Sequence, residues 1–374
     1  MDTTSAKFVS DTDTQMTRRA LALASKGVGL VSPNPLVGCV IVSANGEVVG
    51  EGTYLYDGVT HAEVLALEQA GEHARGGTAY VSLEPHSHHG KTPPCTQALI
   101  NAGIKRVVAP IEDPNPLVSG KGFQALRDAG IEVSVGLCAD EASKLNEKFI
   151  CWHKKSRPFV HLKMAMSLDG RISMGSSVST VLSSDAGMKR VQAFRHEHDA
   201  ILVGANTVVV DDPSLTDRSG FDRRRKLVRV ILDNRLRTPL DATVVKTANE
   251  TPTILVSNST DQEKMKSMIE SGVDFVSADA RDLSAVLQAL RERELQSVLV
   301  EGGSSVAGAF RDAGLIDKLT LMISPRIVGG TEAPLAFTGN GAKSIEEATT
   351  LDDISIQRHG PDIEITGYPK SFAR

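Results

Sequence analysis

The stretch from His61 to Cys95, HAEVLALEQAGEHARGGTAYVSLEPHSHHGKTPPC, decides how the first half of the chain folds. A His two residues before a Glu opens an apolar-periodic run, which predicts a helix from His61 to about His73, ended by the glycines at 76 and 77. TAYVSL (78–83) predicts a buried strand. A second helix is expected from the Pro pair before Cys95, because proline is favoured at the first helical position.

Three side chains of this stretch have the chemistry of a catalytic zinc site. Zinc prefers about four tetrahedral ligands, and catalytic sites take about three from the protein and leave a position for water. His61, His86 and Cys95 are the candidate ligands, and a helix start favours the thiolate form of Cys95. Glu63 is the candidate base that takes a proton from the attacking water and returns it to the leaving group. In the alternative interpretation, Glu63 is only a dipole partner of its helix and Cys95 a small core residue.

The segments on either side of this stretch predict an alternating β/α half. Asn45-Gly46 is a strong hairpin signal between two apolar strands. The expected elements are a helix over 13–26, strands at 37–42, 47–52, 104–110 and 131–136, a helix from Lys121, and a last helix to about Ile150.

The second half begins after a short basic stretch, KKSRP (154–158), that lacks apolar periodicity, so we expect domains at 1–153 and 154–374. Strands are expected at 158–170, 226–233, 251–257, 273–277, 296–303 and 317–325, with a strand and then a turn over 199–215. Helices are expected over 184–200 and near 260–271, 281–292 and 303–313, and a C-terminal antiparallel pair at 354–360 and 362–369. This order predicts an α/β fold with a large, mostly parallel sheet.

One glycine-rich turn, Val300-Glu-Gly-Gly-Ser-Ser305, lies between an expected strand and an expected helix. Small residues there let a phosphate approach the backbone N–H groups at the helix start. The turn does not have the spacing of a dinucleotide fingerprint, and tight strand-to-helix packing is the alternative explanation.

The composition limits the classes of function. With 41 basic and 46 acidic residues the net charge is −5, so the chain lacks the net positive charge that would attract a nucleic acid. The four cysteines have no framework spacing, and neither a signal peptide nor a membrane-spanning run is visible. We therefore expect a cytoplasmic protein that acts on a small molecule, with no nucleic-acid or membrane partner.

The first half resembles the deaminase domain of the bifunctional deaminase-reductases of riboflavin biosynthesis. The resemblance rests on PNPLVGCVIV, HAEVLAL, GGTAYVSLEPHSHHGKTPPC, DPNPLVSGKGFQALRDAGIEV and LNEKF. It implies a cytidine-deaminase-like α/β/α domain whose substrate lies near Asn34, His88 and Asp113. One position departs from the family, which has Cys where this chain has His86. Imidazole is also a competent zinc ligand.

The second half is similar to the reductase domain of the same family, on KMAMSLDGRIS, RHEHDAILVGANTVVVDDPSLTDR, RVILDN, VLVEGGSSVAGAF and LIDKL…SPRIVGG. That domain is similar in fold to dihydrofolate reductase and uses NADPH. The resemblance implies cofactor contacts at Ala165, Val181, Thr207, Asp211, Asn234, Gly302, Gly303 and Ser304. It implies substrate contacts at Ser179, Arg195, Leu215, Arg218 and Glu301. Lys163 and Asp169 would lie beside the nicotinamide as catalytic residues. Val181 stands where bacterial members carry Trp.

These resemblances imply two successive reactions and a homo-oligomer. Zinc would support hydrolytic deamination of 2,5-diamino-6-(5-phosphoribosylamino)pyrimidin-4(3H)-one. NADPH would then reduce 5-amino-6-(5-phosphoribosylamino)uracil to the ribitylamino phosphate. Three alternatives remain at this point: a reductase alone with a metal-free first domain because of His86, a deaminase of nucleic-acid bases, and a nucleotide-binding module without turnover.

Overall fold

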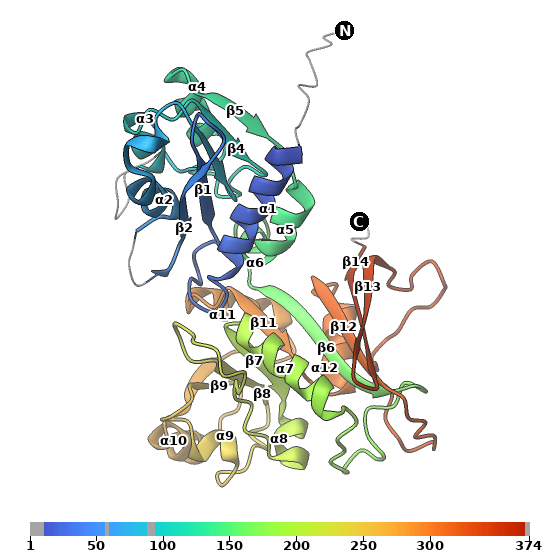
Figure 1. Ribbon diagram of the computed structural model, residues 1–374. Helices are drawn as coiled ribbons and strands as arrows, with labels where there is room; N and C mark the ends of the chain where they lie inside the picture. The colour runs from blue at the N-terminus through green and yellow to red at the C-terminus, as the bar shows by residue number, and fades with distance from the viewer. Residues whose placement is uncertain (1–10, 57–59, 88–93, 371–374) are drawn as a thin grey trace. The chain divides into compact units, whose positions relative to one another are not determined.

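A computed structural model describes residues 11–56, 60–87 and 94–370 of the chain. The chain divides into two compact units, Met1–Ser156 and Arg157–Arg374, and each has its own sheet (Figure 1). Within the described residues, none of the helices has both the length and the apolar character that crossing a bilayer requires.

The first unit is built on a five-stranded mixed sheet. Its strands are β1 (Gly38–Val42), β2 (Val48–Thr53), β3 (Thr78–Val81), β4 (Arg106–Ala109) and β5 (Glu132–Val135). They lie in the order β2-β1-β3-β4-β5, with β1 antiparallel to both neighbours and β3, β4 and β5 parallel. The carboxyl ends of β3 and β4 therefore lie at the same edge of the sheet.

The hairpin expected at Asn45-Gly46 is confirmed, since β1 and β2 pair antiparallel on either side of it. Gly46 has φ 87°, a left-handed conformation that glycine adopts without strain. The N–H of Ser43 donates to the carbonyl of Glu47 over 2.8 Å and closes the turn.

Helices cover both faces of this sheet (Figure 1). They are α1 (Asp11–Ser25), α2 (Ala62–Ala70), the short 3-10 turn η2 (Gly71–Ala74), α3 (Cys95–Asn101), α4 (Lys121–Asp128), α5 (Ala139–Leu145) and α6 (Glu147–Lys154). The side chains of β1 alternate between the two cores: Ile41 packs with α2, α3 and α4, whereas Val40 packs with α1. The expected domain boundary before Lys154 falls in the last turn of α6.

Two glycines let α2 approach the sheet closely. A Cβ at Gly52 would lie 2.0 Å from the carbonyl oxygen of Ala62, and one at Gly50 would lie 2.0 Å from that of Ala66. Because only glycine fits at both positions, β2 fixes the place where α2 begins.

The second unit is built on a nine-stranded sheet. Its strands are β6 (Phe159–Ser167), β7 (Ala200–Gly204), β8 (Val228–Leu232), β9 (Thr253–Ser257), β10 (Asp274–Ser277), β11 (Ser297–Val300), β12 (Lys318–Ser324), β13 (Leu351–His359) and β14 (Asp362–Pro369). The order is β10-β9-β8-β7-β11-β6-β12-β14-β13. All pairs from β10 to β12 are parallel, and β14 is antiparallel to both β12 and β13. The expected mostly parallel sheet with a C-terminal antiparallel pair is confirmed.

Helices also cover both faces of this larger sheet. They are α7 (Asp185–Glu197), α8 (Ala205–Asp211), α9 (Thr243–Lys246), α10 (Gln262–Glu270), α11 (Leu283–Glu292) and α12 (Ser304–Asp312). On one face Leu287 of α11 and Phe310 of α12 pack with Leu162 of β6. On the other face Val245 of α9 and Met268 of α10 belong to a second core.

Three expectations about local structure were wrong. Helix α2 ends at Ala70 rather than His73, because Gly71 takes a left-handed φ of 53°. The segment expected as a turn after β7 is the helix α8, although its β-branched run favours a strand; burial of Val208 in the core outweighs this propensity. The single helix expected to reach Ile150 is interrupted at Asn146, whose side chain instead hydrogen bonds both backbone groups of Leu36.

Candidate active sites

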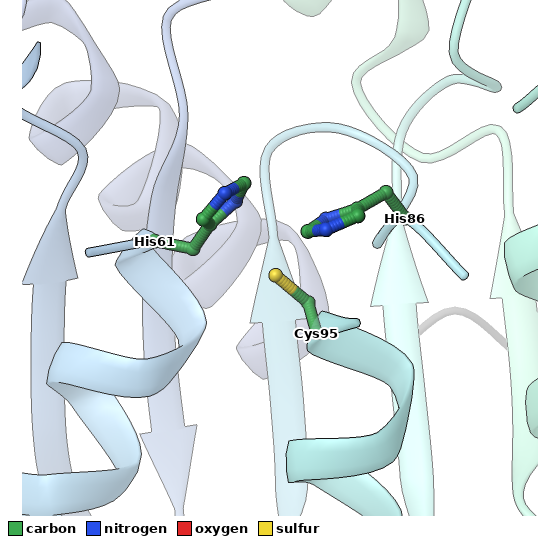
Figure 2. A group of neighbouring side chains, drawn as sticks. All are labelled: His61, His86 and Cys95. Atoms are coloured by element: carbon green, nitrogen blue, oxygen red, sulfur yellow. The ribbon is translucent and has the colours of Figure 1, made fainter. Parts of the chain in front are cut away.

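The three candidate zinc ligands of the first unit come together at helix starts and a strand end. His61 is the residue before α2, His86 lies on the segment after β3, and Cys95 is the first residue of α3. Figure 2 shows the three side chains pointing toward one another. One ligand atom from each lies within 4.8 Å of those of the other two, and the imidazole centroids are 4.4 Å apart. Two imidazoles and a thiol at this separation fit a single zinc ion.

Neighbouring residues contact the ring of His61 and the backbone of His86. The ring of Tyr54 lies 5.6 Å from that of His61, and the amide of Asn34 donates to the Tyr54 hydroxyl over 2.7 Å. Asn34, expected near the substrate, is therefore connected to the metal site through Tyr54, which the sequence interpretation did not consider. The carbonyl of His86 accepts hydrogen bonds from the amide and the hydroxyl of Thr96, over 3.3 and 3.4 Å.

Glu63 is buried beside these ligands, with 2% of its surface exposed. Its Oε2 atom has no hydrogen-bond partner among the described residues, which is costly unless a ligand or substrate completes the site. Burial, followed by the charge of Glu63, raises the pKa of the Cys95 thiol. Zinc binding requires the thiolate, so the metal must displace this proton when it binds.

The loop after β4 contains Asp113, which was expected near the substrate and is 8% exposed. Burial raises the pKa of Asp113 to about 6; the hydrogen bond from the Asn115 N–H opposes this, and the nearby charge of Glu84 adds to it. Sequence reasoning missed Glu84, although a Glu directly after a strand and before Pro85 was visible. His88, also expected near the substrate, lies outside the described residues.

In the second unit, the expected NADPH contacts gather at one edge of the parallel sheet. The strands β6, β7, β8 and β11 run in the same direction, so the segments that follow them leave from a common edge. Six of the expected contacts lie on these segments: Thr207, Asp211, Asn234, Gly302, Gly303 and Ser304. Asp169, predicted as a catalytic residue, also lies on one of them. Ligands of open α/β sheets bind outside the carboxyl ends of the strands.

Three predicted residues form a buried ionic cluster close to this edge. The guanidinium of Arg195 donates to both carboxylate oxygens of Glu301, over 3.0 and 3.1 Å, and Lys163 Nζ lies 3.7 Å from Glu301 Oε2. Burial lowers the pKa of Lys163, and the charge of Glu301 opposes this effect. Burial by itself would raise the pKa of Glu301, but the two cations outweigh it and hold that pKa below its usual value.

The two glycines of the turn after β11 differ in their surroundings. A Cβ at Gly302 would lie 2.6 Å from the Cβ of Val306, so the turn needs glycine there. Gly303 precedes α12, and nothing lies within 4 Å of its Cβ position. The tight-packing explanation therefore accounts for Gly302, and open space of the kind a phosphate needs is found at Gly303.

Asp169 and Asn234 hold loops at the same edge. Asp169 accepts hydrogen bonds from the hydroxyl of Ser167 over 2.5 Å and from the N–H groups of Val328 and Gly329 over 3.0 and 2.7 Å. The hydrogen bond from the Ser167 hydroxyl, followed by those from the two backbone N–H groups, lowers the pKa of Asp169. The carbonyl oxygen of the Asn234 side chain accepts from the N–H of Ala280 over 2.8 Å.

The remaining predicted contacts differ in exposure. Arg218, Ser179 and Val181 are exposed, the last by 73%, whereas Leu215 is buried at 2% and has φ 49°. Any contact of a substrate with Leu215 must therefore involve its backbone. Ala165 is half-buried on β6.

The loop that carries Arg218 is fixed by the predicted residue Arg195 and by two residues that the sequence interpretation missed, Asp217 and Arg223. Asp217 pairs with Arg223 over 2.7 Å, and Arg195 donates to the carbonyl of Thr216 over 3.0 Å. Arg195 therefore connects the ionic cluster to this loop.

Comparisons with known proteins agree with both sites. Residues 10–110 match the cytidine and deoxycytidylate deaminase zinc-binding region, and residues 158–365 match the RibD C-terminal domain. The riboflavin biosynthesis protein RibD of Actinobacillus pleuropneumoniae is 42% identical over 363 residues, covering 96% of each chain. That of Escherichia coli is 39% identical, covering 92% of this chain and 96% of its own.

Solved structures give the same result. RibD of Acinetobacter baumannii superposes with a TM-score of 0.86 at 37% identity, covering 96% of this chain and 99% of its own. A diaminohydroxyphosphoribosylaminopyrimidine deaminase/5-amino-6-(5-phosphoribosylamino)uracil reductase from Thermotoga maritima gives 0.85 at 36% identity, with the same coverage.

The fold and the two sites thus define a zinc-dependent, cytidine-deaminase-like domain joined to an NADPH-dependent α/β reductase domain. The chain belongs to the RibD family of riboflavin biosynthesis. It is a bifunctional deaminase and reductase that uses zinc and NADPH and acts on a small molecule. The alternative of a reductase alone is not favoured, and His86 is one of three side chains whose ligand atoms lie close enough to hold a metal ion.

Proposed function

We propose that His61, His86 and Cys95 hold the zinc and that the first unit deaminates 2,5-diamino-6-(5-phosphoribosylamino)pyrimidin-4(3H)-one. The observation that carries this proposal is the convergence of the three ligand atoms within 4.8 Å. When bound, zinc supplies Lewis-acid activation of the attacking water. Asn34 and Asp113 are also proposed to contact the substrate. Asn34 is connected to the ring of His61 through Tyr54, and Asp113 lies on the loop after β4.

Glu63 is proposed to be the general acid and base of the deamination. Its buried Oε2 atom has no partner among the described side chains and backbone groups, so it is ready to accept a proton from the water. The same atom then delivers that proton to the amino group that leaves as ammonia. A carboxylate that carries out both transfers needs no second acid in the site.

In the second unit, the proposed reaction is the reduction of 5-amino-6-(5-phosphoribosylamino)uracil to the ribitylamino phosphate. NADPH supplies the hydride when bound. Lys163 is proposed to donate a proton or hydrogen bond at the opened ribose, because it is buried beside Glu301 and burial lowers its pKa. Glu301, which is itself held by Arg195, pairs with the Nζ atom of Lys163, and Arg218 is proposed to bind the phosphate as a planar bidentate donor.

Two further proposals concern the oligomeric state of the enzyme and its location in the cell. The family resemblance supports a homo-oligomer that associates through the reductase unit. The need for NADPH supports a cytoplasmic location.

Zinc measurements on His86 variants test the proposed metal site. We expect about one zinc per wild-type chain. Loss of an outer-shell partner already costs about 10–100-fold in metal affinity, so His86→Ala should weaken zinc binding by more than about 100-fold. His86→Cys should keep the metal. Ammonia release should fail in the Ala variant, while NADPH oxidation with the deaminated substrate stays unchanged.

Cobalt provides a second measurement of the same site. In the cobalt-loaded protein, a Cys at position 86 should strengthen the thiolate-to-metal absorption relative to the wild type, since it adds a second thiolate. Zinc binding by His86→Ala as tight as that of the wild type would exclude His86 from the ligand set.

We also propose that Asp169 positions the loop of Val328 and Gly329 at the edge of the sheet where NADPH is expected. The variant Asp169→Asn tests this role. An amide replaces one acceptor oxygen by a donor that faces the N–H of Val328 or Gly329. We expect NADPH binding, measured by fluorescence titration, to weaken about tenfold while kcat at saturating NADPH falls much less. Asp241→Asn, on an exposed loop of the same unit, is the matched control. A loss confined to kcat would instead favour direct participation of Asp169 in the chemistry.

A further inference from the structure

Glu84 is a buried carboxylate that the proposed chemistry does not use. It is 4% exposed and follows β3. Its Oε2 atom accepts the N–H groups of Asp113 and Gly120 over 3.0 and 2.9 Å, and its Oε1 atom accepts those of Gly122 and Phe123 over 2.8 and 3.3 Å. Hydrogen bonds to an ionised acceptor are the stronger class, so this side chain holds both ends of one segment.

The segment that Glu84 holds is the loop between β4 and α4. Inside it, Asp113 accepts the N–H of Asn115 over 2.8 Å, and Asn115 in turn accepts the N–H of Leu117 over 3.1 Å. These bonds order the loop locally but do not attach it to the strand that precedes His86. The Glu84 side chain makes that attachment at both ends of the loop.

Backbone packing supports the same connection. The N–H of Glu84 donates to the carbonyl of Ile111 over 3.2 Å. A Cβ at Gly122 would lie 1.9 Å from the carbonyl oxygen of Pro85, so α4 begins in direct contact with the residue before His86. The loop and the ligand-bearing segment are therefore fitted to each other.

The metal ligand itself does not depend on the Glu84 carboxylate. Thr96, next to Cys95, holds the carbonyl of His86 through its amide and its hydroxyl. Removing the Glu84 charge should therefore leave the three zinc ligands in place and release the loop.

We propose that Glu84 is a positioning residue of the deaminase site, which sets Asp113 relative to the zinc ligands. This inference rests on the proposed function of Asp113 as a substrate contact. Replacement of one Glu84 oxygen by an amide NH₂ leaves two backbone N–H groups facing a donor. The loop must then move, and a misplacement of about 1 Å can cost on the order of 100-fold in rate.

The test compares Glu84→Gln, Asp113→Asn and the double variant in the full-length, zinc-loaded enzyme. For Glu84→Gln we expect KM for the diamino substrate to rise at least about tenfold, kcat to fall less, and zinc content to stay at the wild-type level. Because both residues act through one contact, the double variant should have the KM of Asp113→Asn alone. Glu112→Gln, an exposed carboxylate of the same loop, is the matched control and should behave as the wild type.

Other outcomes separate this inference from the function on which it rests. Multiplicative effects of the two substitutions, or an unchanged KM in Glu84→Gln, would overturn the positioning role. If zinc-loaded wild type releases no ammonia, the proposed function itself fails. Glu84→Asp keeps the charge, so its KM should lie between those of the wild type and Glu84→Gln. If Glu84→Gln does not fold, the same double-mutant cycle is measured with Glu84→Asp and Asp113→Asn. Additive effects in that cycle would also overturn the proposal.

Discussion

Glu63→Gln should abolish ammonia release while leaving zinc in the enzyme. General acid–base catalysis contributes about 10²–10⁴-fold, and Glu63 is proposed to perform both proton transfers, so we expect kcat to fall by at least about 10³-fold. Glutamine is nearly the same size and also fits the buried position, but its amide neither accepts nor returns a proton. The measurement is ammonia release under substrate saturation, with zinc content determined on the same sample.

Two controls accompany this variant. Glu68→Gln changes an exposed carboxylate of the same helix, α2, and should leave the rate unaltered. NADPH oxidation with the deaminated substrate should also be unchanged in Glu63→Gln, because the reductase site lies in the other unit. Ammonia release within about tenfold of the wild type would remove Glu63 from the role of base.

Glu301→Gln should disable the reductase and destabilise its domain. This substitution leaves Lys163 and Arg195 buried without their shared counter-ion. Breaking a buried ion pair by removing one partner typically costs about 3–5 kcal/mol, so thermal unfolding of the reductase unit should occur at a clearly lower temperature. Loss of a preorganised charge at the site should lower kcat for NADPH oxidation by about 10²–10³-fold.

The pKa of Glu301 determines how its contribution to stability depends on pH. The pKa of Glu301 is lower in the folded chain, so its contribution to stability is present above the usual pKa of a glutamate and disappears only as the pH falls through the lowered value. The stability difference between Glu301→Gln and the wild type should therefore be constant from about pH 6 to 8. Glu263→Gln, exposed on α10, is the control. Equal unfolding temperatures of Glu301→Gln and wild type would show that the cluster is not held by this carboxylate.

The proposed zinc ligands could be identified from the sequence because each is next to a local signal. His61 and Cys95 lie at helix starts that apolar periodicity and the proline pair mark. His86 was found from its place between them, after a strand, even though the family has Cys there. Local signals of this kind need no knowledge of contacts between distant segments.

The residues that hold the sites could not be predicted in the same way. Glu84 bonds N–H groups 29 to 39 residues further along, and Asp169 bonds those of Val328 and Gly329, 159 and 160 residues away. No local pattern connects such positions. The helix α8 was missed for a related reason, since burial of Val208 in the core outweighed its propensity.

The sequence by itself indicated the class of each domain, most of the strands and helices, and the candidate residues for the chemistry, because periodicity, turn residues and motifs are properties of neighbouring positions. Only the tertiary structure decided that His61, His86 and Cys95 meet within 4.8 Å, and that Glu301 lies between Lys163 and Arg195. Parallel strands end at a common edge, and the order of strands in the sheet decides which loops become neighbours there. That order depends on the burial of whole faces of the sheet, which no single stretch of sequence specifies.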